Sequence, residues 1–266
     1  MSISKRNLIY SIHRALAILD LRVVRVGRLF RIQRFVENNA SRDLRFFLAL
    51  PPRVRHKLLK NLPKSKSQLL QDLLVLYLTD FKRNGYFVEF GATNGIDLSN
   101  TYLLESEFDW MGILAEPAIC WQSELKLNRK AAIEVKCVWS TSGDQIEFNE
   151  TSIAELSTVA SFSYLDLHKT ERESGSRYAV ETISINNLLS KHKAPHYIDY
   201  LSIDTEGSEF EILASLDFEK YSFGVITCEH NFTPQREKIQ FLLESQGYSR
   251  VFVEISEFDD WYIKSD

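Results

Sequence analysis

The amino-acid sequence predicts a doubly wound α/β fold with a mostly parallel sheet. From Tyr86 onward, short apolar runs alternate with segments of helical periodicity, which is typical of βαβ units and of strands buried on both faces. The last two strand-like segments are separated by only a few residues, a connection too short for a parallel crossover. An antiparallel hairpin therefore closes the predicted sheet at the C-terminus.

The predicted elements follow a regular order from residue 68 to the C-terminus. A helix over Gln68–Arg83 leads into the first strand. The parallel strands are Tyr86–Phe90, Gly112–Ala115, Ile133–Trp139, Tyr200–Ile203 and Gly224–Cys228. The helices are Ser99–Glu107, Cys120–Asn128, Glu209–Leu216 and Gln235–Gln246, and the hairpin pairs Tyr248–Ile255 with Trp261–Lys264. A longer insertion between Thr141 and Ile185 holds two further strand-like segments, Gln145–Phe148 and Tyr178–Ile185.

Residues 1–66 differ from the rest of the chain in charge and in periodicity. They contain 16 Lys and Arg against 3 Asp and Glu, whereas residues 67–266 contain 16 against 33. Apolar residues recur at helical spacing over residues 8–30, and Pro51-Pro52 and residues 61–67 interrupt the helical pattern. We therefore predict a basic helical N-terminal region, residues 1–66, and a main domain, residues 67–266.

The composition predicts an ordinary globular protein of the cytoplasm. Apolar residues make up 44% of the chain and charged residues 26%, which allows a sizeable core. The three cysteines lack metal-ligand spacing, so we expect reduced thiols. No secretory signal is evident, and Arg14, Asp20 and Arg22 interrupt the N-terminal apolar residues before they reach the roughly 20 residues of a membrane span.

The first predicted strand ends in a turn that contains two glycines. Its sequence is Glu89-Phe-Gly91-Ala92-Thr93-Asn94-Gly95. In open α/β sheets, ligands bind outside the carboxyl ends of the strands. Gly91 lets the backbone approach a ligand closely, Gly95 can adopt a positive φ, and the Glu89 carboxylate suits a ligand's ammonium group. A plain tight turn is the alternative, and Thr93 breaks the GxGxxG dinucleotide fingerprint.

Two further strand ends carry acidic residues. The second strand ends at Glu116-Pro117, where a carboxylate can accept hydrogen bonds from ribose hydroxyls; a solvated loop residue or helix cap is the alternative. The fourth strand ends at Asp204-Thr-Glu206-Gly-Ser-Glu209, just before a helix. We expect these carboxylates beside the ligand's reactive group, although Asp204 or Ser208 could instead only cap the helix.

These strand ends resemble the FkbM family of S-adenosylmethionine-dependent methyltransferases. The similar segments are Phe87–Thr101, Gly112–Pro117, Thr182–Leu189 and Asp199–Leu213, and the Asp-x-Glu-Gly-x-Glu string that starts at Asp204 is the most specific. The resemblance implies a Rossmann-like methyltransferase sheet and S-adenosylmethionine as the donor. It also implies a hydroxyl acceptor, typically on a sugar or a natural product. Asn94 departs from the Asp expected there, and residues 1–66 lie outside the resemblance.

With this donor, the strand ends acquire specific expected roles. Glu89 would bind the ammonium of the methionine moiety, and Glu116 would bind the ribose. We expect contacts to S-adenosylmethionine from Glu89, Gly91, Ala92, Thr93, Asn94, Gly95, Asn100, Glu116, Pro117, Val138 and Asp204.

Methyl transfer to a hydroxyl group also needs a group that removes the proton. The fifth strand leads to Glu229-His230-Asn231, and we predict catalytic roles for Asp204, Glu206 and His230; a purely structural His230 is the alternative. Asp204, Glu229 and His230 could also hold Mg²⁺ or Mn²⁺, which would lower the pKa of a sugar hydroxyl. Asp166 and His168 in the insertion are a second acceptor-site candidate or a surface loop.

Two other functions stay open at this point. One is a nicotinamide-dependent sugar oxidoreductase, which the missing GxGxxG disfavours, and the other is a non-catalytic binding module. We expect a sugar or glycolipid acceptor from polysaccharide biosynthesis and no nucleic acid. The basic residues 1–66 are expected to bind peripherally at the inner membrane face, or to act as a helical cap or as a dimerisation element in a homo-oligomer.

Overall fold

The computed structural model describes residues 40–151, 153–163 and 169–265. The chain divides into two units between Ala49 and Leu50, and in the first unit residues 40–49 are helical. The second unit begins with helix α3 (Pro52–Asn61) and the short 3-10 helix η1 (Leu62–Lys64). The boundary after residue 66 stays a prediction. The helical pattern of residues 8–30 and the candidates Asp166 and His168 lie outside the described residues.

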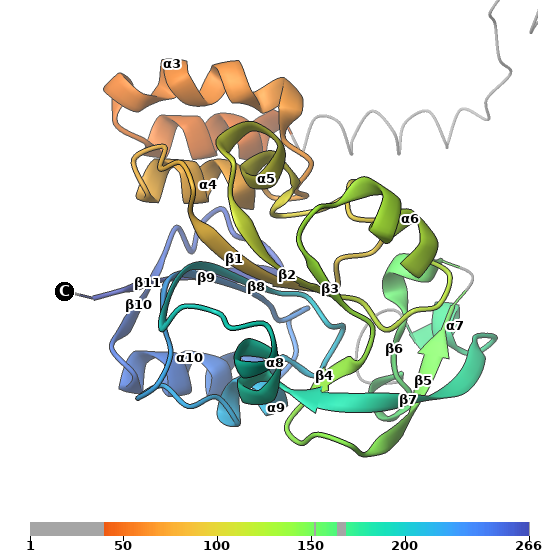
Figure 1. Ribbon diagram of the computed structural model, residues 1–266. Helices are drawn as coiled ribbons and strands as arrows, with labels where there is room; N and C mark the ends of the chain where they lie inside the picture. Colours follow the sequence, from red (N-terminus) through yellow and green to blue (C-terminus); the bar gives the residue numbers. More distant parts are fainter. Residues whose placement is uncertain (1–39, 152, 164–168, 266) are drawn as a thin grey trace, which may run out of the picture. The chain divides into compact units, whose positions relative to one another are not determined.

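A seven-stranded sheet forms the centre of the second unit (Figure 1). Its order is β10-β11-β9-β8-β1-β2-β3. All neighbours from β9 to β3 are parallel, whereas β11 is antiparallel to β9 and β10 is antiparallel to β11. The strands are β1 (Tyr86–Phe90), β2 (Met111–Ala115), β3 (Ala132–Glu134), β8 (Tyr197–Ile203), β9 (Ser222–Glu229), β10 (Tyr248–Val251) and β11 (Asp259–Lys264). The predicted parallel sheet and closing hairpin are confirmed.

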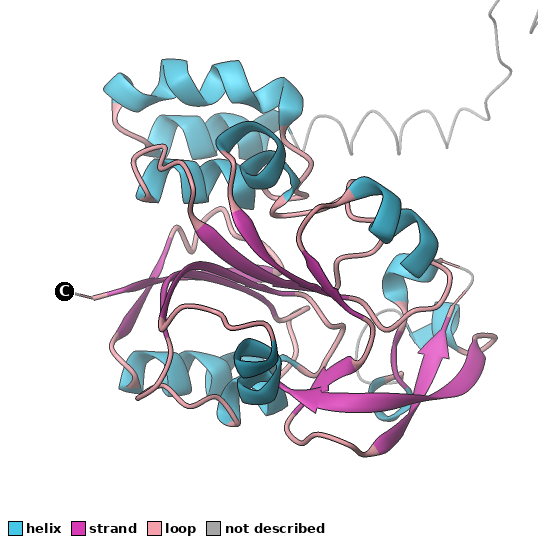
Figure 2. Ribbon diagram, viewed as in Figure 1, coloured by secondary structure: helices cyan, strands magenta, loops and turns pink. Residues whose placement is uncertain are grey.

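Helices cover both faces of this sheet (Figures 1 and 2). One face carries α4 (Gln71–Leu78), α5 (Tyr102–Phe108) and α6 (Gln122–Asn128), and the other carries α8 (Ile185–Lys191), α9 (Glu209–Ala214) and α10 (Gln235–Ser245). The strands are buried between these layers: Val88, Ile113, Leu201 and Ile226 are all fully buried. β-branched and aliphatic side chains on both strand faces favour this three-layer arrangement.

Two helices, α4 and α5, depart from their predicted bounds by three residues or more, and each has a local cause. Helix α4 ends at Leu78 because Asp80 and Phe81 adopt positive φ values of 49° and 58°, which a right-handed helix excludes. Helix α5 starts at Tyr102, three residues later than predicted. The backbone N–H groups of residues 101 and 102 donate to the Ser99 hydroxyl at 3.2 and 3.1 Å, so Ser99 acts in the manner of a cap.

The prediction of one strand over Ile133–Trp139 is wrong. Strand β3 ends at Glu134, and β4 (Cys137–Trp139) belongs to a different sheet. The Glu134 carboxylate accepts hydrogen bonds from the backbone N–H groups of Val135 and Lys136 at 3.1 and 3.2 Å. These bonds stabilise a turn of the chain, which takes β4 out of the main sheet.

The insertion forms a second sheet of order β4-β7-β5-β6. Strand β7 (Ser176–Ser184) is parallel to β4 and antiparallel to β5 (Gln145–Glu150), which pairs with β6 (Thr158–Val159). The short helices η2 (Ala154–Leu156), η3 (Ala160–Phe162) and α7 (Lys169–Arg172) connect the strands. Helix α8, which our sequence prediction lacks, follows β7 directly, and the Ser184 hydroxyl caps it by accepting from the N–H of Asn187 at 3.3 Å.

Within the described ranges, no helix combines the length and the apolar character that crossing a membrane requires.

Candidate functional site

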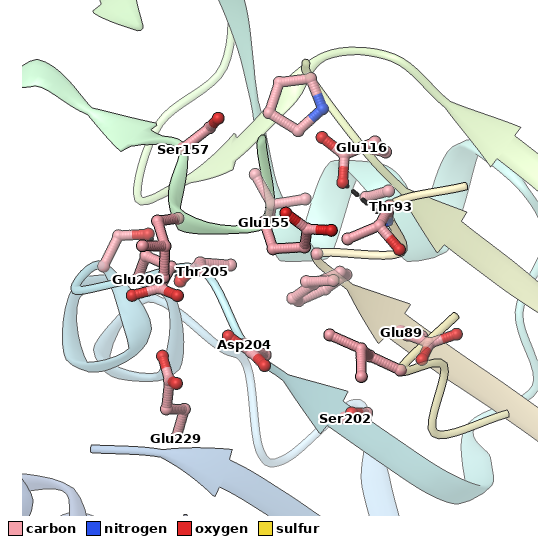
Figure 3. Close-up of a pocket in the computed structure, with 18 of the residues that line it drawn as sticks. Glu89, Thr93, Glu116, Glu155, Ser157, Ser202, Asp204, Thr205, Glu206 and Glu229 are labelled. Carbon is pink, nitrogen blue, oxygen red and sulfur yellow. Dashed lines mark hydrogen bonds between the residues drawn. The ribbon is translucent and has the colours of Figure 1, made fainter. Parts of the chain in front are cut away.

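A cavity of about 410 Å³ lies at the carboxyl ends of β1, β2, β8 and β9. Figure 3 shows carboxylates around it from several elements. Asp204, Glu206 and Glu229 lie on one side, Glu116 and Thr93 on another, and Glu155 projects between the two groups. The insertion contributes part of the wall through η2 and β6. The cavity therefore occupies the edge of the sheet that the sequence predicts, with a cover supplied by the second sheet.

Gly91 allows the ends of strands β1 and β8 to approach each other. It has a φ of 79°, and a Cβ atom at this position would lie 1.9 Å from the carbonyl oxygen of Asp204. No other residue type fits here without moving one of the two backbones. Gly95 also has a positive φ of 83°, but it does not line the cavity. The glycine requirement therefore comes from packing between two strand ends, and Gly91 borders the cavity as well.

Glu116 is buried at the end of β2 and faces the glycine turn. Its two carboxylate oxygens accept hydrogen bonds from the backbone N–H groups of Thr93 and Ala118 at 2.9 and 2.8 Å. The pKa of Glu116 is raised to about 7, mainly by burial and to a smaller extent by the negative charges of Asp204 and Glu150, while the two N–H groups oppose the rise. Each carboxylate oxygen keeps a lone pair for a ligand, so Glu116 can accept from the hydroxyl groups of a ribose.

The Glu89 carboxylate accepts several hydrogen bonds from neighbouring residues of the protein. Its oxygens accept from the backbone N–H of Asn100 at 2.6 Å and from the hydroxyls of Ser99 and Thr101 at 3.1 and 2.5 Å. Arg129 lies 3.6 Å from the same carboxylate. Glu89 lines the cavity, but these contacts also make it the anchor of the segment that precedes α5.

Asn100 presents a polar atom without a hydrogen-bond partner among the described residues. Its amide nitrogen donates to the Ser202 hydroxyl at 2.9 Å, while its buried Oδ1 has no donor. Asn100 borders the cavity, so a ligand's donor group could satisfy this oxygen.

The other residues predicted to contact S-adenosylmethionine divide into two groups. Pro117 and Val138 line the cavity. Ala92, Asn94 and Gly95 are not among the cavity-lining residues. The Asn94 side chain folds back on its own loop, where Oδ1 accepts from the N–H groups of residues 96 and 97 at 2.9 Å each. Asn94 is therefore a loop-forming residue in this structure.

Asp204, Glu206 and Glu229 form a cluster of carboxylates. One oxygen of each lies within 4.8 Å of the others, and of the residues that the structure describes, these three are the group that could hold a metal ion. The Asp204 and Glu229 carboxyls interact with each other in this cluster, and a proton held by either one would allow a hydrogen bond between them. Burial raises the pKa of both residues, and that of Glu229 is raised further by Asp204. The pair therefore retains a proton to higher pH than an exposed carboxyl would.

Arg172 of the insertion holds Glu206 in this cluster. Its side chain is fully buried, and Nη2 donates to the Glu206 carboxylate at 2.7 Å. Its Nε donates to the carbonyl oxygen of Leu156 at 2.8 Å. Glu206 has a positive φ of 58°, an uncommon conformation that persists at functional sites when surrounding contacts enforce it. Arg172 escaped sequence analysis because no local motif marks it and its partner lies 34 positions away.

Glu209 stabilises the turn between Asp204 and α9. One carboxylate oxygen accepts from the N–H groups of Thr205 and Gly207, each at 3.0 Å, and from the Thr205 hydroxyl at 2.9 Å. No side chain makes a cap hydrogen bond to helix α9, so neither Ser208 nor Asp204 is a cap of this helix. Asp204 lines the cavity instead.

His230 lies behind the carboxylate cluster. His230 lines a second cavity of about 320 Å³, together with Phe162, Glu206 and Glu229, and does not line the main one. Nδ1 accepts from the N–H of Phe232 at 3.0 Å, and Nε2 lies 3.8 Å from Asp260. Burial lowers the pKa of His230 to about 4, so the ring is neutral near pH 7.

The sequence from residue 89 to residue 261 matches the model of the Methyltransferase FkbM domain. The match covers well over half of the chain and includes the ends of all four cavity-lining strands. The chain belongs to the FkbM family. The resemblance seen in the sequence is thereby confirmed, and this FkbM protein is a methyltransferase. The second sheet, which closes the cavity, also lies within the FkbM match.

Solved structures resemble this FkbM protein only distantly. Precorrin-6y C5,15-methyltransferase from Geobacter metallireducens GS-15 is 10% identical, with a TM-score of 0.41 over 73% of this chain and 87% of that chain. The fibrillarin/Nop5p complex is 11% identical, with a TM-score of 0.36 over 75% of this chain and 81% of that chain. The CurJ carbon methyltransferase is 9% identical, with a TM-score of 0.37 over 74% of this chain and 53% of that chain. No curated protein matches the sequence.

Proposed function

We propose that this methyltransferase transfers the methyl group of S-adenosylmethionine to a hydroxyl group, on a sugar of a polysaccharide, a glycolipid or a natural product. One observation carries the proposal. A single cavity joins a buried strand-end acid, Glu116, which suits a ribose, to the carboxylate pair Asp204 and Glu229. A nucleoside-bearing donor and a proton acceptor would thus lie side by side.

The donor would occupy the side of the cavity formed by β1 and β2. Glu116 would accept from the ribose hydroxyls, and the unpartnered Oδ1 of Asn100 would accept from the ammonium of the methionine moiety. Val138 and Phe148 supply apolar surface for a flat base. The glycine fingerprint for a dinucleotide pyrophosphate is absent from the turn at Gly91, which disfavours a nicotinamide cofactor.

We assign the general base to Asp204. When bound, the donor supplies a methyl group on a positively charged sulfur, which leaves as a neutral thioether. Asp204 lies at the cavity edge of β8, where its carboxylate would accept the proton of the attacking hydroxyl as the new O–C bond forms. The protonated Glu229 would donate to Asp204 and keep it in place. Glu206 would act as a positioning residue, because Arg172 already neutralises its charge.

Mg²⁺ or Mn²⁺ is a second way to neutralise this cluster. Its ligands would be Asp204, Glu206 and Glu229, because one oxygen of each lies within 4.8 Å of the others, and His230 is not part of this group. The Arg172 guanidinium compensates one of the three charges, and a proton retained by the Asp204–Glu229 pair would compensate a second. We therefore expect methyl transfer to persist in EDTA; activity lost in EDTA and restored by Mg²⁺ would instead establish a metal-dependent reaction.

Calorimetric titration with S-adenosylmethionine and with NAD tests the donor, and labelled methyl transfer to a panel of glycans tests the reaction. We expect S-adenosylmethionine to bind, NAD not to bind, and label to enter an O-methyl group. Binding of NAD alone would favour an oxidoreductase. A protein that binds neither would be a binding module on this fold.

We also propose that the enzyme works in the cytoplasm, peripherally at the inner membrane face. Helix α3 and the segment after it expose Arg53, Lys60 and Lys66, and residues 1–66 contain only three acidic residues. Sedimentation of the full chain with anionic and with neutral vesicles tests this. Equal pelleting with the two kinds of vesicle would leave the basic residues as a helical cap or as a dimerisation element.

A further inference from the structure

The cavity is lined by carboxyl groups from five different segments. Of the described residues that line it, none is Lys, Arg or His. The carboxyl groups belong to Glu89, Glu116, Glu155, Asp204, Glu206 and Glu229. Such a lining attracts ligands that donate hydrogen bonds or carry positive charge, and it repels anions.

Protein cations compensate only two of these six carboxylates. Arg129 lies 3.6 Å from Glu89, and Arg172 lies 2.7 Å from Glu206. Glu116, Glu155, Asp204 and Glu229 form no ion pair with any described cation. The unpartnered Asn100 Oδ1 is one more acceptor atom at the same cavity. A ligand that satisfies this site must therefore be rich in donor groups.

Glu155 is placed to act on the acceptor. It lies on η2, and Figure 3 shows its carboxylate projecting between Glu116 and the Asp204 cluster. The next residue, Leu156, is held by its carbonyl oxygen, which accepts from the buried Arg172 at 2.8 Å. The same arginine binds Glu206, so one side chain ties η2 to the proposed base region. Glu155 itself is exposed and makes no hydrogen bond to a described residue, which leaves its charge free for a ligand.

We propose that the acceptor site selects by charge, with Glu155 as a specificity-determining residue. A sugar with an ammonium group beside the reacting hydroxyl is preferred over a neutral sugar, and a neutral sugar over one with a carboxylate or phosphate there. This inference rests on the proposed O-methyl transfer. With the donor bound at Glu116 and Asn100, the acceptor's ammonium would donate to Glu155 and to the Asp204–Glu229 pair, whereas an anion would lose water and gain only like-charged neighbours.

The test uses the full-length protein and three matched methyl glycosides, of glucosamine, glucose and glucuronic acid. Their affinities for the protein saturated with S-adenosylhomocysteine are measured by calorimetry at pH 7, and label transfer from S-adenosylmethionine is measured in parallel. We expect the affinity for the glucosamine glycoside to exceed that for the glucuronide by at least about tenfold, because two unit charges separate them. Equal or stronger binding of the glucuronide overturns the inference, as does failure of the glucosamine glycoside to bind.

Charge variants locate the effect. Glu155→Gln should reduce the ratio of glucosamine to glucuronide affinity by about threefold, and Glu155→Lys should reduce it by about tenfold. Glu219→Gln is the matched control, since Glu219 is exposed just before β9 and therefore at the opposite edge of the sheet. Unchanged ratios in both Glu155 variants would remove Glu155 from the site. A protein that binds the glycosides in the expected order but transfers no label would contradict the proposed function and leave charge selection standing.

Discussion

Two sets of buried carboxylates lie at the strand ends of this FkbM methyltransferase, and their hydrogen bonds differ. The anchoring carboxylates, Glu89 and Glu209, each accept three or more hydrogen bonds from neighbouring backbone and hydroxyl groups. In the reactive pair, the Asp204 and Glu229 carboxyls interact with each other. Burial raises the pKa of Glu209 and of both members of the pair, but hydrogen-bond donors oppose the rise at Glu209, whereas the charge of Asp204 adds to the rise at Glu229.

The difference teaches how acids of similar sequence position can have opposite tasks. A carboxylate surrounded by donors is stable as an anion and contributes to the fold. A carboxylate whose partner is another carboxylate destabilises the fold and gains basicity, which suits proton transfer near neutral pH. The predictions below test this separation, from the largest expected effect to the smallest.

Glu89→Gln should destabilise the protein most. The substitution removes one of the two carboxylates that pair with the fully buried Arg129, although Glu105 stays 3.1 Å from the guanidinium, and it removes an acceptor from the segment that precedes α5. Leaving buried donors without a charged acceptor costs about 3 kcal/mol of unfolding free energy. Urea unfolding followed by circular dichroism measures the loss. A loss below about 1 kcal/mol would mean that Glu89 is no anchor, and Glu124→Gln, at an exposed position on α6, is the control.

His230→Asn should change how stability depends on pH. The pKa of His230 is about 4 in the folded protein and about 6.5 when unfolded, so below pH 6.5 the unfolded chain binds more protons. Folding stability is therefore lost as the pH falls from 6.5 to 4, by about 2 kcal/mol for this residue. The variant should lack this part of the loss. Identical pH–stability curves for the two proteins would contradict the buried, neutral imidazole.

Glu116 lies between the two sets, because two N–H groups bind it and yet its pKa is about 7. Ribose hydroxyls donate to the ionised carboxylate, so affinity for S-adenosylmethionine should fall as the pH drops below 7, by up to about tenfold per unit. Glu116→Gln should bind about tenfold more weakly at pH 8 and show a flat profile. Calorimetry at pH 6, 7 and 8 decides; a wild-type affinity independent of pH would remove Glu116 from the ribose site.

Asp204→Asn should have the smallest effect on stability, in the stabilising direction. Asparagine can keep a hydrogen bond to Glu229, and it removes a buried charge beside other carboxylates. We expect the unfolding free energy to rise by up to about 1 kcal/mol. A loss of 2 kcal/mol or more in urea unfolding would place Asp204 among the anchoring carboxylates.

Much of this arrangement could be predicted from the sequence because it is local. Strand β1 has the predicted bounds, Tyr86–Phe90, and Gly95 in the following turn has the predicted positive φ. The apolar periodicity gave the parallel sheet and its hairpin. The split of β3 from β4 depends on one side chain, Glu134, that folds back on the next two backbone N–H groups. Composition and periodicity do not register such a turn.

Which of the predicted site residues line the main cavity depends on three-dimensional geometry, and their positions along the sequence predict it only in part. Glu229 is the last residue of β9 and lines both cavities, whereas His230 lies beyond the strand and lines the second cavity but not the main one. The spacing of residues along the sequence does not show which cavity a residue beyond a strand end will line. Arg172 left no signal, because its contact with Glu206 comes from the fold of the insertion. The hydrogen bonds that make Glu89 an anchor also come from a segment that follows the strand.

The rate of labelled methyl transfer in Asp204→Asn and His230→Asn tests the central claim most directly. Both variants are compared with the wild type at saturating S-adenosylmethionine, after calorimetry has shown that each still binds the donor. We predict that Asp204→Asn lowers kcat by about 100-fold or more, whereas His230→Asn stays within about threefold of the wild type. A His230→Asn variant that loses the reaction while Asp204→Asn keeps it would contradict the assignment of Asp204 as the base.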